Sequence, residues 1–202
     1  MQSELWQEIP EFEGASVEQH WIEANSGFHL RVLHWTPEQE QAKQARTLVM
    51  IPGWNSVPEG WYPILSEWVK HRPVVYIETR EKGSCRIDSA ISKEIFLVPN
   101  IASDLPIILQ KMQLNPAECD AIGSSLGATL LLEGLREDTL VFRSLVVLSP
   151  NLAFIPPLWA RPLIPAPLFM YNALVRFVIW YLEKILKMYL KVFQTFLIKC
   201  RQ

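Results

Sequence analysis

The stretch Cys119–Gly127 holds the only G-x-S-x-G pattern of the chain, between a short apolar run and a sequence typical of a helix. The pattern predicts a strand, a sharp turn and then a helix over Ala128–Arg136. In so sharp a turn, side chains at Gly123 and Gly127 would collide with neighbouring backbone. Ser125 would take a strained conformation that points its hydroxyl away from the sheet, beside the N–H groups of the helix start. Because three fixed positions also recur by chance, a small-residue turn between a closely packed strand and helix is the alternative.

Two segments rich in β-forming residues lie near the start of the chain. They are Val17–Glu23 and Phe28–Thr36, and the sequence Asn25-Ser26-Gly27 between them supplies turn residues. We therefore expect a β-hairpin. The polar segment Pro37–Ala45 that follows is expected to form a solvated loop or a short exposed helix.

Apolar runs alternate with helical spacings from Thr47 onwards. Apolar runs without a polar face predict buried strands at Thr47–Ile51, Val74–Ile77, Ala121–Ile122 and Ser144–Leu148. Apolar residues at helical spacing predict helices at Trp61–Lys70 and Ile101–Met112, with Asp104 suited to a helix start. This order predicts an α/β fold with a mostly parallel central sheet and helices on both faces. Ligands of such sheets bind at the carboxyl ends of strands, where Gly53-Trp54, Glu78–Ser84 and Ser125 fall.

Charge and cysteine usage exclude several classes of function. The net charge of −2 gives no overall attraction to nucleic acid. Cys85, Cys119 and Cys200 lie far apart without a C-x-x-C pair, so neither a disulfide framework nor a zinc knuckle is expected. The acidic start Met1–Gly14 has no apolar core, which argues against a secretory signal. We therefore expect a reducing, cytoplasmic location.

The histidines carry no metal-ligand spacing: they are His20, His29, His34 and His71. The first three fall in the predicted hairpin, where they are better explained as members of alternating strands than as catalytic groups. The chain also lacks a glycine-rich phosphate loop. We expect neither a metal ion nor a cofactor.

Four features in order across roughly Val17–Asn151 resemble the α/β-hydrolase superfamily. The hairpin comes first, followed by a strand that ends in an oxyanion-type loop, Ile51–Trp54. The next strand ends in Glu78–Ser84, which is similar to the family turn D-x-R-G-x-G-x-S with several substitutions. The G-x-S-x-G of residues 123–127 then follows at the expected distance, as the family's nucleophile elbow.

The resemblance implies catalytic roles for three residues. Ser125 would be the nucleophile. The backbone N–H of Leu126, next to it, would be one oxyanion donor. Trp54 would supply the other, with Gly53 as the alternative. Acyl transfer builds negative charge on one oxygen, and each fixed donor stabilises it by about 3 kcal/mol.

The chain departs from this family after the elbow. No histidine follows His71, whereas the family places its acid and then its histidine base late in the chain. A serine hydroxyl without a base is a weak nucleophile. The carboxylates after the elbow lie in helices or at a helix end, at Glu133, Glu137, Asp138 and Glu183, and the loop Ser149–Asn151 has none. By resemblance, the chain corresponds to the first two-thirds of a hydrolase and ends inside the insertion that forms the lid. A truncated or frameshifted reading frame would explain this.

The sequence divides into residues 1–150, the N-terminal part of the hydrolase core, and residues 151–202. The second part begins rich in proline, and Leu174–Ile198 then carries a polar stripe at helical spacing on an otherwise apolar and aromatic segment. After Val175, six basic residues stand against Glu183 alone. A basic, aromatic amphipathic helix is typical of a lid or of peripheral contact with a membrane interface. The sequence contains no uncharged, proline-free stretch of about 18 residues, so it does not predict a membrane span.

Together, these features predict a serine hydrolase that cleaves an ester or thioester bond of a small acyl substrate through Ser125. Activity in this chain should be absent or weak, because no histidine follows the nucleophile. Oxyanion-hole and binding effects alone leave a residual acceleration of about 10³–10⁴ over water. The alternative is a non-catalytic pseudo-hydrolase, or a membrane-associated binding protein that uses its basic, aromatic C-terminal helix. The oligomeric state stays open.

Overall fold

The computed structural model describes residues 8–25, 27–88 and 91–151, together with residues 176, 177, 180, 181 and 184. The chain separates into two compact units, Met1–Leu152 and Ala153–Gln202. All the strands below belong to the first unit. In chain order they are β1 (Ala15–Glu23), β2 (Phe28–Pro37), β3 (Leu48–Ile51), β4 (Val74–Ile77), β5 (Arg86–Ile87), β6 (Asp120–Ser124) and β7 (Ser144–Leu148).

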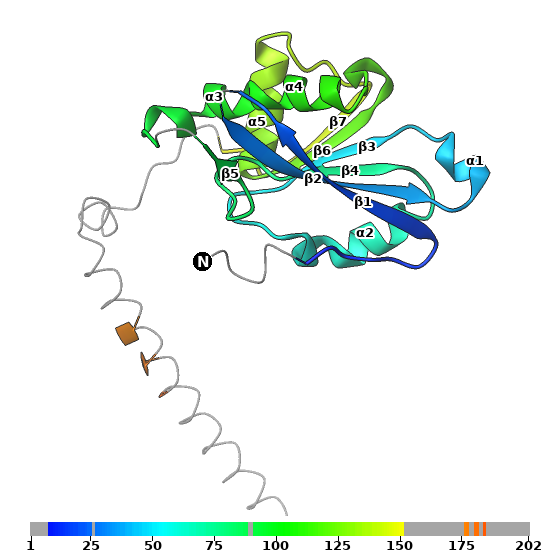
Figure 1. Cartoon of the computed structure of the whole chain (residues 1–202), viewed down its shortest axis with the longest axis horizontal. Coiled ribbons are helices and arrows are strands. Elements are labelled where there is room, and N and C mark those ends of the chain that lie inside the picture. Colours follow the sequence, from blue (N-terminus) through cyan, green and yellow to red (C-terminus); the bar gives the residue numbers. More distant parts are fainter. Residues whose placement is uncertain are drawn as a thin grey trace, which may run out of the picture. The chain divides into compact units, whose positions relative to one another are not determined.

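The strands form one mixed sheet in the order β1-β2-β4-β3-β6-β7 (Figure 1). Strands β1 and β2 are the predicted antiparallel hairpin, and β2 continues antiparallel to β4 and to the short β5. Strands β4, β3, β6 and β7 are mutually parallel. The predicted α/β class with a mostly parallel central sheet is confirmed. The strand β5 had no signal in the sequence.

Helices cover both faces of the sheet, as predicted. The α-helices are α1 (Glu40–Lys43), α2 (Tyr62–Trp68), α3 (Val98–Ala102), α4 (Asp104–Lys111) and α5 (Leu126–Arg136). Figure 1 shows α2 on one side of the sheet and α3, α4 and α5 on the other. Three short 3₁₀ turns complete the connections, at Pro58–Trp61, Glu94–Phe96 and Pro116–Glu118.

The buried strand β3 explains this two-sided arrangement. Successive side chains of a strand point to opposite faces. Val49 and Ile51 pack into the cluster that contains residues of α4 and α5, whereas Leu48 and Met50 pack with Leu65 of α2. All four β3 residues are buried. An apolar run without a polar face therefore fits a strand that lies between two helical layers.

Two predicted elements differ from the structure. Strand β7 has the predicted bounds, but it is not buried: Val146 and Leu148 are 49% and 42% exposed. It pairs only with β6 at the end of the strand order, so one of its edges is unpaired within the described sheet. The predicted helix Ile101–Met112 is two helices, α3 and α4, that meet at Ser103. Pro106 explains the break, because its nitrogen has no hydrogen to donate to the carbonyl of Ala102.

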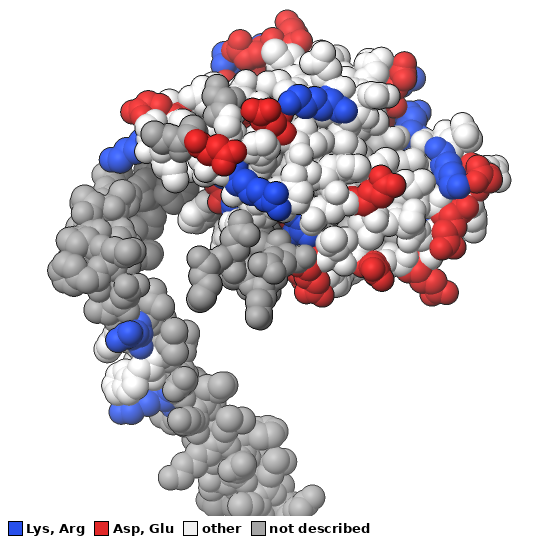
Figure 2. All heavy atoms as spheres, in the orientation of Figure 1, with Lys and Arg blue, Asp and Glu red and all other residues white. Residues whose placement is uncertain are grey.

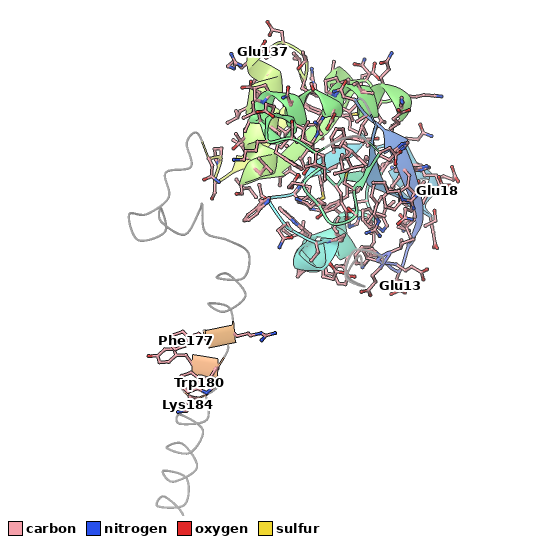
Figure 3. All side chains as sticks on the ribbon, turned by 60° about the vertical axis from the view of Figure 1, so that its left-hand side comes forward. Glu13, Glu18, Glu137, Phe177, Trp180 and Lys184 are labelled. Carbon is pink, nitrogen blue, oxygen red and sulfur yellow. The ribbon has the colours of Figure 1, made fainter. Side chains whose placement is uncertain are left out.

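The predicted proline-rich segment and most of the predicted tail helix lie outside the described residues. The described residues of the second unit are helical, and Figure 3 labels Phe177, Trp180 and Lys184 among them. The Phe177 and Trp180 ring centroids are 5.9 Å apart, and the Lys184 Nζ lies 4.4 Å from the Trp180 ring centroid. Within the described part of the chain, no helix is long and apolar enough to cross a membrane.

Charged side chains of both signs are dispersed over the described surface. On the face in Figure 2, acidic and basic groups are scattered among uncharged ones, and the charged groups along the lower edge of the first unit are acidic. Several are paired on the surface, such as Lys43 with Glu40 and Arg136 with Glu133. This face therefore presents no broad area of one sign.

Candidate active site

Ser125 lies in the turn between β6 and α5 with φ of 49° and ψ of −114°. This conformation is rare for a residue with a side chain, and it carries strain. The Ser125 N–H donates to the Leu148 carbonyl at 2.8 Å, so the pairing with β7 continues one residue beyond β6. Helix α5 begins at Leu126, two residues earlier than predicted. The half-buried Ser125 therefore stands where the sheet ends and a helix starts.

The two glycines of the pattern are required by backbone packing. A Cβ at Gly127 would lie 2.0 Å from the Ile51 carbonyl oxygen. A Cβ at Gly123 would lie 2.7 Å from the Ala128 nitrogen. Real Cβ atoms do not approach backbone so closely, so helix α5 packs against β3 and β6 only because both side chains are absent. The collisions predicted from the sequence are confirmed.

The loop after β3 approaches the Ser125 side chain. A Cβ built on Gly53 would lie 3.2 Å from the Ser125 Cβ. The Gly53 carbonyl accepts the Ser56 N–H at 3.1 Å, which closes a turn in which the Trp54 side chain is 73% exposed. Neither the Trp54 N–H nor the Leu126 N–H donates to another described residue. The loop that contains Gly53 and Trp54 thus lies beside Ser125, and Leu126 is the next residue along the chain.

Asn151 is a residue of the site that the sequence did not indicate. Its Nδ2 donates to the Ser125 Oγ at 3.1 Å. The Thr129 hydroxyl of α5 fixes Asn151, since it donates to the Asn151 carbonyl at 3.1 Å and accepts the Asn151 N–H at 3.0 Å. Adjacent parallel strands end at the same edge, so the position of Asn151 three residues after β7 was the available signal.

The turn Glu78–Ser84 is buried and mainly structural. Arg80 pairs with the Asp104 carboxylate through two nitrogens and donates to the Ile95 carbonyl at 3.0 Å. Asp104 begins α4 as predicted, but its carboxylate serves this buried pair. Burial raises the pKa of Glu78, while the Ser84 hydroxyl and the Arg31 guanidinium oppose that rise.

Lys82 comes from the same turn and reaches the oxyanion-type loop. Its side chain is 0% exposed, and its Nζ donates to the Gly53 carbonyl at 2.6 Å and to the Glu81 carboxylate. Burial lowers the pKa of Lys82, and the neighbouring Glu81 carboxylate opposes that change. A buried lysine side chain thus contacts the loop that approaches Ser125.

None of the histidines lies at Ser125. On β1, His20 pairs with Glu18, and on β2, His29 pairs with Asp88. His71 follows α2 and pairs with Glu67 of that helix. His34 lies on β2, and burial together with the charge of His20 lowers its pKa. The three hairpin histidines are therefore strand residues, as predicted. A hollow of about 690 Å³ lies along β1 and the end of α4, and no residue of the elbow lines it.

No family model and no curated protein matches the chain. Solved structures do match. N-formylmaleamic acid deformylase from Pseudomonas putida S16 is 20% identical over 71% of this chain and 53% of its own, with a TM-score of 0.54. An α/β hydrolase from Novosphingobium aromaticivorans is 17% identical over 66% of this chain and 44% of its own, with a TM-score of 0.54. Potato epoxide hydrolase I is 15% identical over 71% and 43%, with a TM-score of 0.55.

These matches show that the chain has the α/β-hydrolase fold. The chain spans about half of the length of these solved structures. Their printed names include a deformylase and an epoxide hydrolase, which are hydrolytic enzymes that act on different bonds. At these identities the matches show the fold and leave the reaction open.

Proposed function

We propose that this chain carries the nucleophile and the oxyanion donors of a serine hydrolase that acts on a small ester or thioester. Ser125 is the nucleophile, and the N–H groups of Trp54 and Leu126 stabilise the oxyanion. The observation that carries the proposal is the strained Ser125 backbone, with φ of 49°, between two glycines that packing requires. Such strain in a residue with a reactive hydroxyl supports function, because glycine would adopt the same backbone without strain.

The proposed activity is weak, because no histidine contacts Ser125. The Ser125 Oγ is bound instead by Asn151 Nδ2, and an amide cannot take up a proton as a general base. Two oriented N–H donors still stabilise an oxyanion when a triad is incomplete. We therefore expect slow turnover of activated substrates with good leaving groups.

The test is hydrolysis of p-nitrophenyl acetate by the wild-type chain, Ser125→Ala and Ser124→Ala. Ser124 is the matched control, because it is the adjacent serine and its hydroxyl also lies near Gly53. We expect Ser125→Ala to remove turnover above the buffer rate and Ser124→Ala to retain it. Equal rates in the wild type and Ser125→Ala would refute a nucleophilic role. Mass spectrometry of a trapped acyl group would locate it on Ser125.

Peripheral membrane contact is a second candidate function, favoured by the aromatic group of the C-terminal unit. Phe177, Trp180 and Tyr181 are each at least half exposed, and Lys184 lies over the Trp180 ring. Exposed aromatic rings beside a cation suit the interface of an anionic lipid bilayer. The wild-type chain should co-sediment with vesicles that contain anionic lipid, and the double variant Phe177→Ser, Trp180→Ser should remain in the supernatant. Equal partition of both proteins would refute this second function.

A further inference from the structure

We propose that Lys82 is a positioning residue for the oxyanion loop: its ammonium group holds the Gly53 carbonyl and thereby sets the Trp54 N–H on the side of Ser125. This inference rests on the proposed function and identifies what orients one of its two donors. Lys82 belongs to neither the elbow nor the loop that it orients.

The strand order separates Lys82 from Ser125 by one strand. Strand β3 lies between β4 and β6 in the sheet. The loop after β3, which begins with Pro52 and Gly53, therefore has the loop after β4 on one flank and the elbow after β6 on the other. Lys82 comes from the first flank and contacts the Gly53 carbonyl at 2.6 Å. Ser125 comes from the second flank, and its Cβ lies 3.2 Å from the position that a Cβ on Gly53 would take.

The geometry of one peptide unit links these two contacts. The bond between Gly53 and Trp54 is trans, as are the other peptide bonds of the described chain. In a planar trans peptide, the C=O and the following N–H point in opposite directions. A Gly53 carbonyl held toward Lys82, on the β4 flank, therefore directs the Trp54 N–H toward the β6 flank, where Ser125 lies. Rotation of this peptide would move the donor away from the hydroxyl.

The charge of Lys82 also strengthens the donor that it orients. A hydrogen bond from an ammonium group to a carbonyl is charge-assisted and polarises the peptide group. The Trp54 N–H of the polarised peptide is a stronger donor to an oxyanion than it would be otherwise. The Ser56 N–H shares the Gly53 carbonyl at 3.1 Å, but it is uncharged and belongs to the same loop. Among the described residues, Lys82 is the hydrogen-bond partner that ties this peptide to a different loop.

Glu81 offers a matched control, because it is the other polar partner of the Lys82 ammonium. If Lys82 serves only to satisfy its own buried charge, the loss of either residue should have the same consequence. If Lys82 orients the loop, Lys82→Met should disturb the site, whereas Glu81→Gln should leave the Gly53 contact in place. Lys82→Gln, which keeps a neutral donor, provides a third variant in case Lys82→Met does not fold.

The experiment measures the Gly53 carbonyl ¹³C and Trp54 amide ¹⁵N resonances, together with kcat and KM for p-nitrophenyl acetate. We expect Lys82→Met to shift both resonances and to lower kcat about tenfold with KM unchanged, below the 10²–10³-fold cost of deleting a donor outright. Lys82→Gln should fall between Lys82→Met and the wild type. Glu81→Gln should keep the Gly53 contact, and it should change the resonances and kcat less than Lys82→Met does. Resonances that do not move in the folded Lys82 variants, or that move equally in Glu81→Gln, would overturn the inference.

The two proposals fail in different ways. Unchanged kcat in the folded Lys82 variants, with turnover abolished by Ser125→Ala, would overturn the role of Lys82 and leave the nucleophile in place. Equal turnover in the wild type and Ser125→Ala would overturn the proposed function. The resonances would then still decide whether Lys82 sets the orientation of the Gly53–Trp54 peptide.

Discussion

The two ends of the parallel strands are built differently. At the carboxyl ends, the loops after β3, β6 and β7 each contain a non-glycine residue with positive φ. These residues are Asn55 at 53°, Ser125 at 49° and Ser149 at 50°. Such conformations are uncommon for residues with a Cβ. The loops at this end therefore hold backbone that the chain would not adopt by itself.

At the amino ends, the same strands are held by charge-assisted and backbone hydrogen bonds. The Asp120 carboxylate, at the start of β6, accepts from Arg46 at 3.3 Å, from Arg72 and from the Ser144 hydroxyl at 2.7 Å. The Asp120 N–H donates to the Thr47 carbonyl at 3.0 Å. One carboxylate thus connects the start of β6 with the start of β7 and with residues that precede β3 and β4.

The difference shows that one sheet meets two requirements at opposite ends. The carboxyl ends carry the loops of the candidate site, and the amino ends contribute stability. The strained residues at the carboxyl ends lie in the loops around Ser125, and such strain lowers stability. Ionic hydrogen bonds at the amino ends add stability, although Gln113 and Asp138, in the connections that lead to β6 and β7, also have positive φ. Relief of the strain at Ser125 should therefore raise stability, whereas loss of the Asp120 carboxylate should lower it.

The largest expected effect is that of Gly127→Ala at the carboxyl ends. The new Cβ would lie 2.0 Å from the Ile51 carbonyl oxygen, so α5 would have to separate from β3. We expect a loss of more than about 4 kcal/mol in the free energy of unfolding, or failure to fold. Urea unfolding followed by circular dichroism measures it. Gly60→Ala is the control, because a Cβ there has no atom within 4 Å. Similar midpoints for both variants would contradict the packing role of Gly127.

Asp120→Ala tests the amino ends. The variant leaves the Ser144 hydroxyl and the guanidinium groups of Arg46 and Arg72 without their shared acceptor. We expect a loss of about 2–3 kcal/mol in the free energy of unfolding. Glu133→Ala is the control, because it removes a carboxylate that pairs with the exposed Arg136 on α5. Its midpoint should stay close to that of the wild type. A comparable loss of unfolding free energy in the two variants would show that the Asp120 carboxylate contributes no more to stability than the surface pair of Glu133 and Arg136.

The same carboxylate predicts a dependence on pH. Burial by itself disfavours the ionised Asp120, but hydrogen bonds from Arg72 and Ser144 outweigh it and lower its pKa to about 2. The unfolded value is about 3.9, so this stabilisation is complete above that pH and is lost as the pH falls toward 2. After discounting for solvent screening, we expect about 1–2 kcal/mol. Chemical unfolding between pH 5 and pH 2.5 should show a smaller decline for Asp120→Asn than for the wild type. An equal decline of the unfolding free energy with falling pH in both proteins would contradict the stabilising role of the ionised Asp120.

Ser125→Gly should have the smallest effect, and one of opposite sign. Glycine adopts the observed φ of 49° without strain, so the variant should gain about 1 kcal/mol in the free energy of unfolding while losing the hydroxyl. Ser125→Ala also loses the hydroxyl but keeps a Cβ, so it should not gain stability. Thermal unfolding of the two variants isolates the backbone contribution. Equal stability in both would mean that the elbow is not strained.

The sequence predicts where strands and helices lie better than it predicts how deeply they are buried. Strands β3 and β7 have the same apolar pattern, and both were predicted as buried. Val49 of β3 is fully buried, whereas Val146 of β7 is 49% exposed. Periodicity reports the character of a strand's two faces, but burial depends on which elements lie beside it. That information is tertiary and is not contained in the strand itself.

The candidate site shows the same division. Gly123, Ser125 and Gly127 were identified because their roles arise within one turn, where local sterics dictate the residue types. Asn151 and Lys82 come from other strands, and their contacts depend on the order of strands in the sheet. Asp104 was assigned to a helix start, but its buried pairing with Arg80 could not be read from its own helix. Contacts between loops required the structure.

The close approach of α5 to β3 has a consequence for how such a chain would drift under mutation. Because a Cβ at Gly127 would meet the Ile51 backbone, selection for folding alone retains this glycine, whether or not any substrate is turned over. The same holds for Gly123. Ser125 differs, since a glycine there would relax the backbone. In a lineage released from selection for catalysis, the two glycines should persist while the serine between them is replaced. The serine, and not the glycines around it, is therefore the position that records a history of activity.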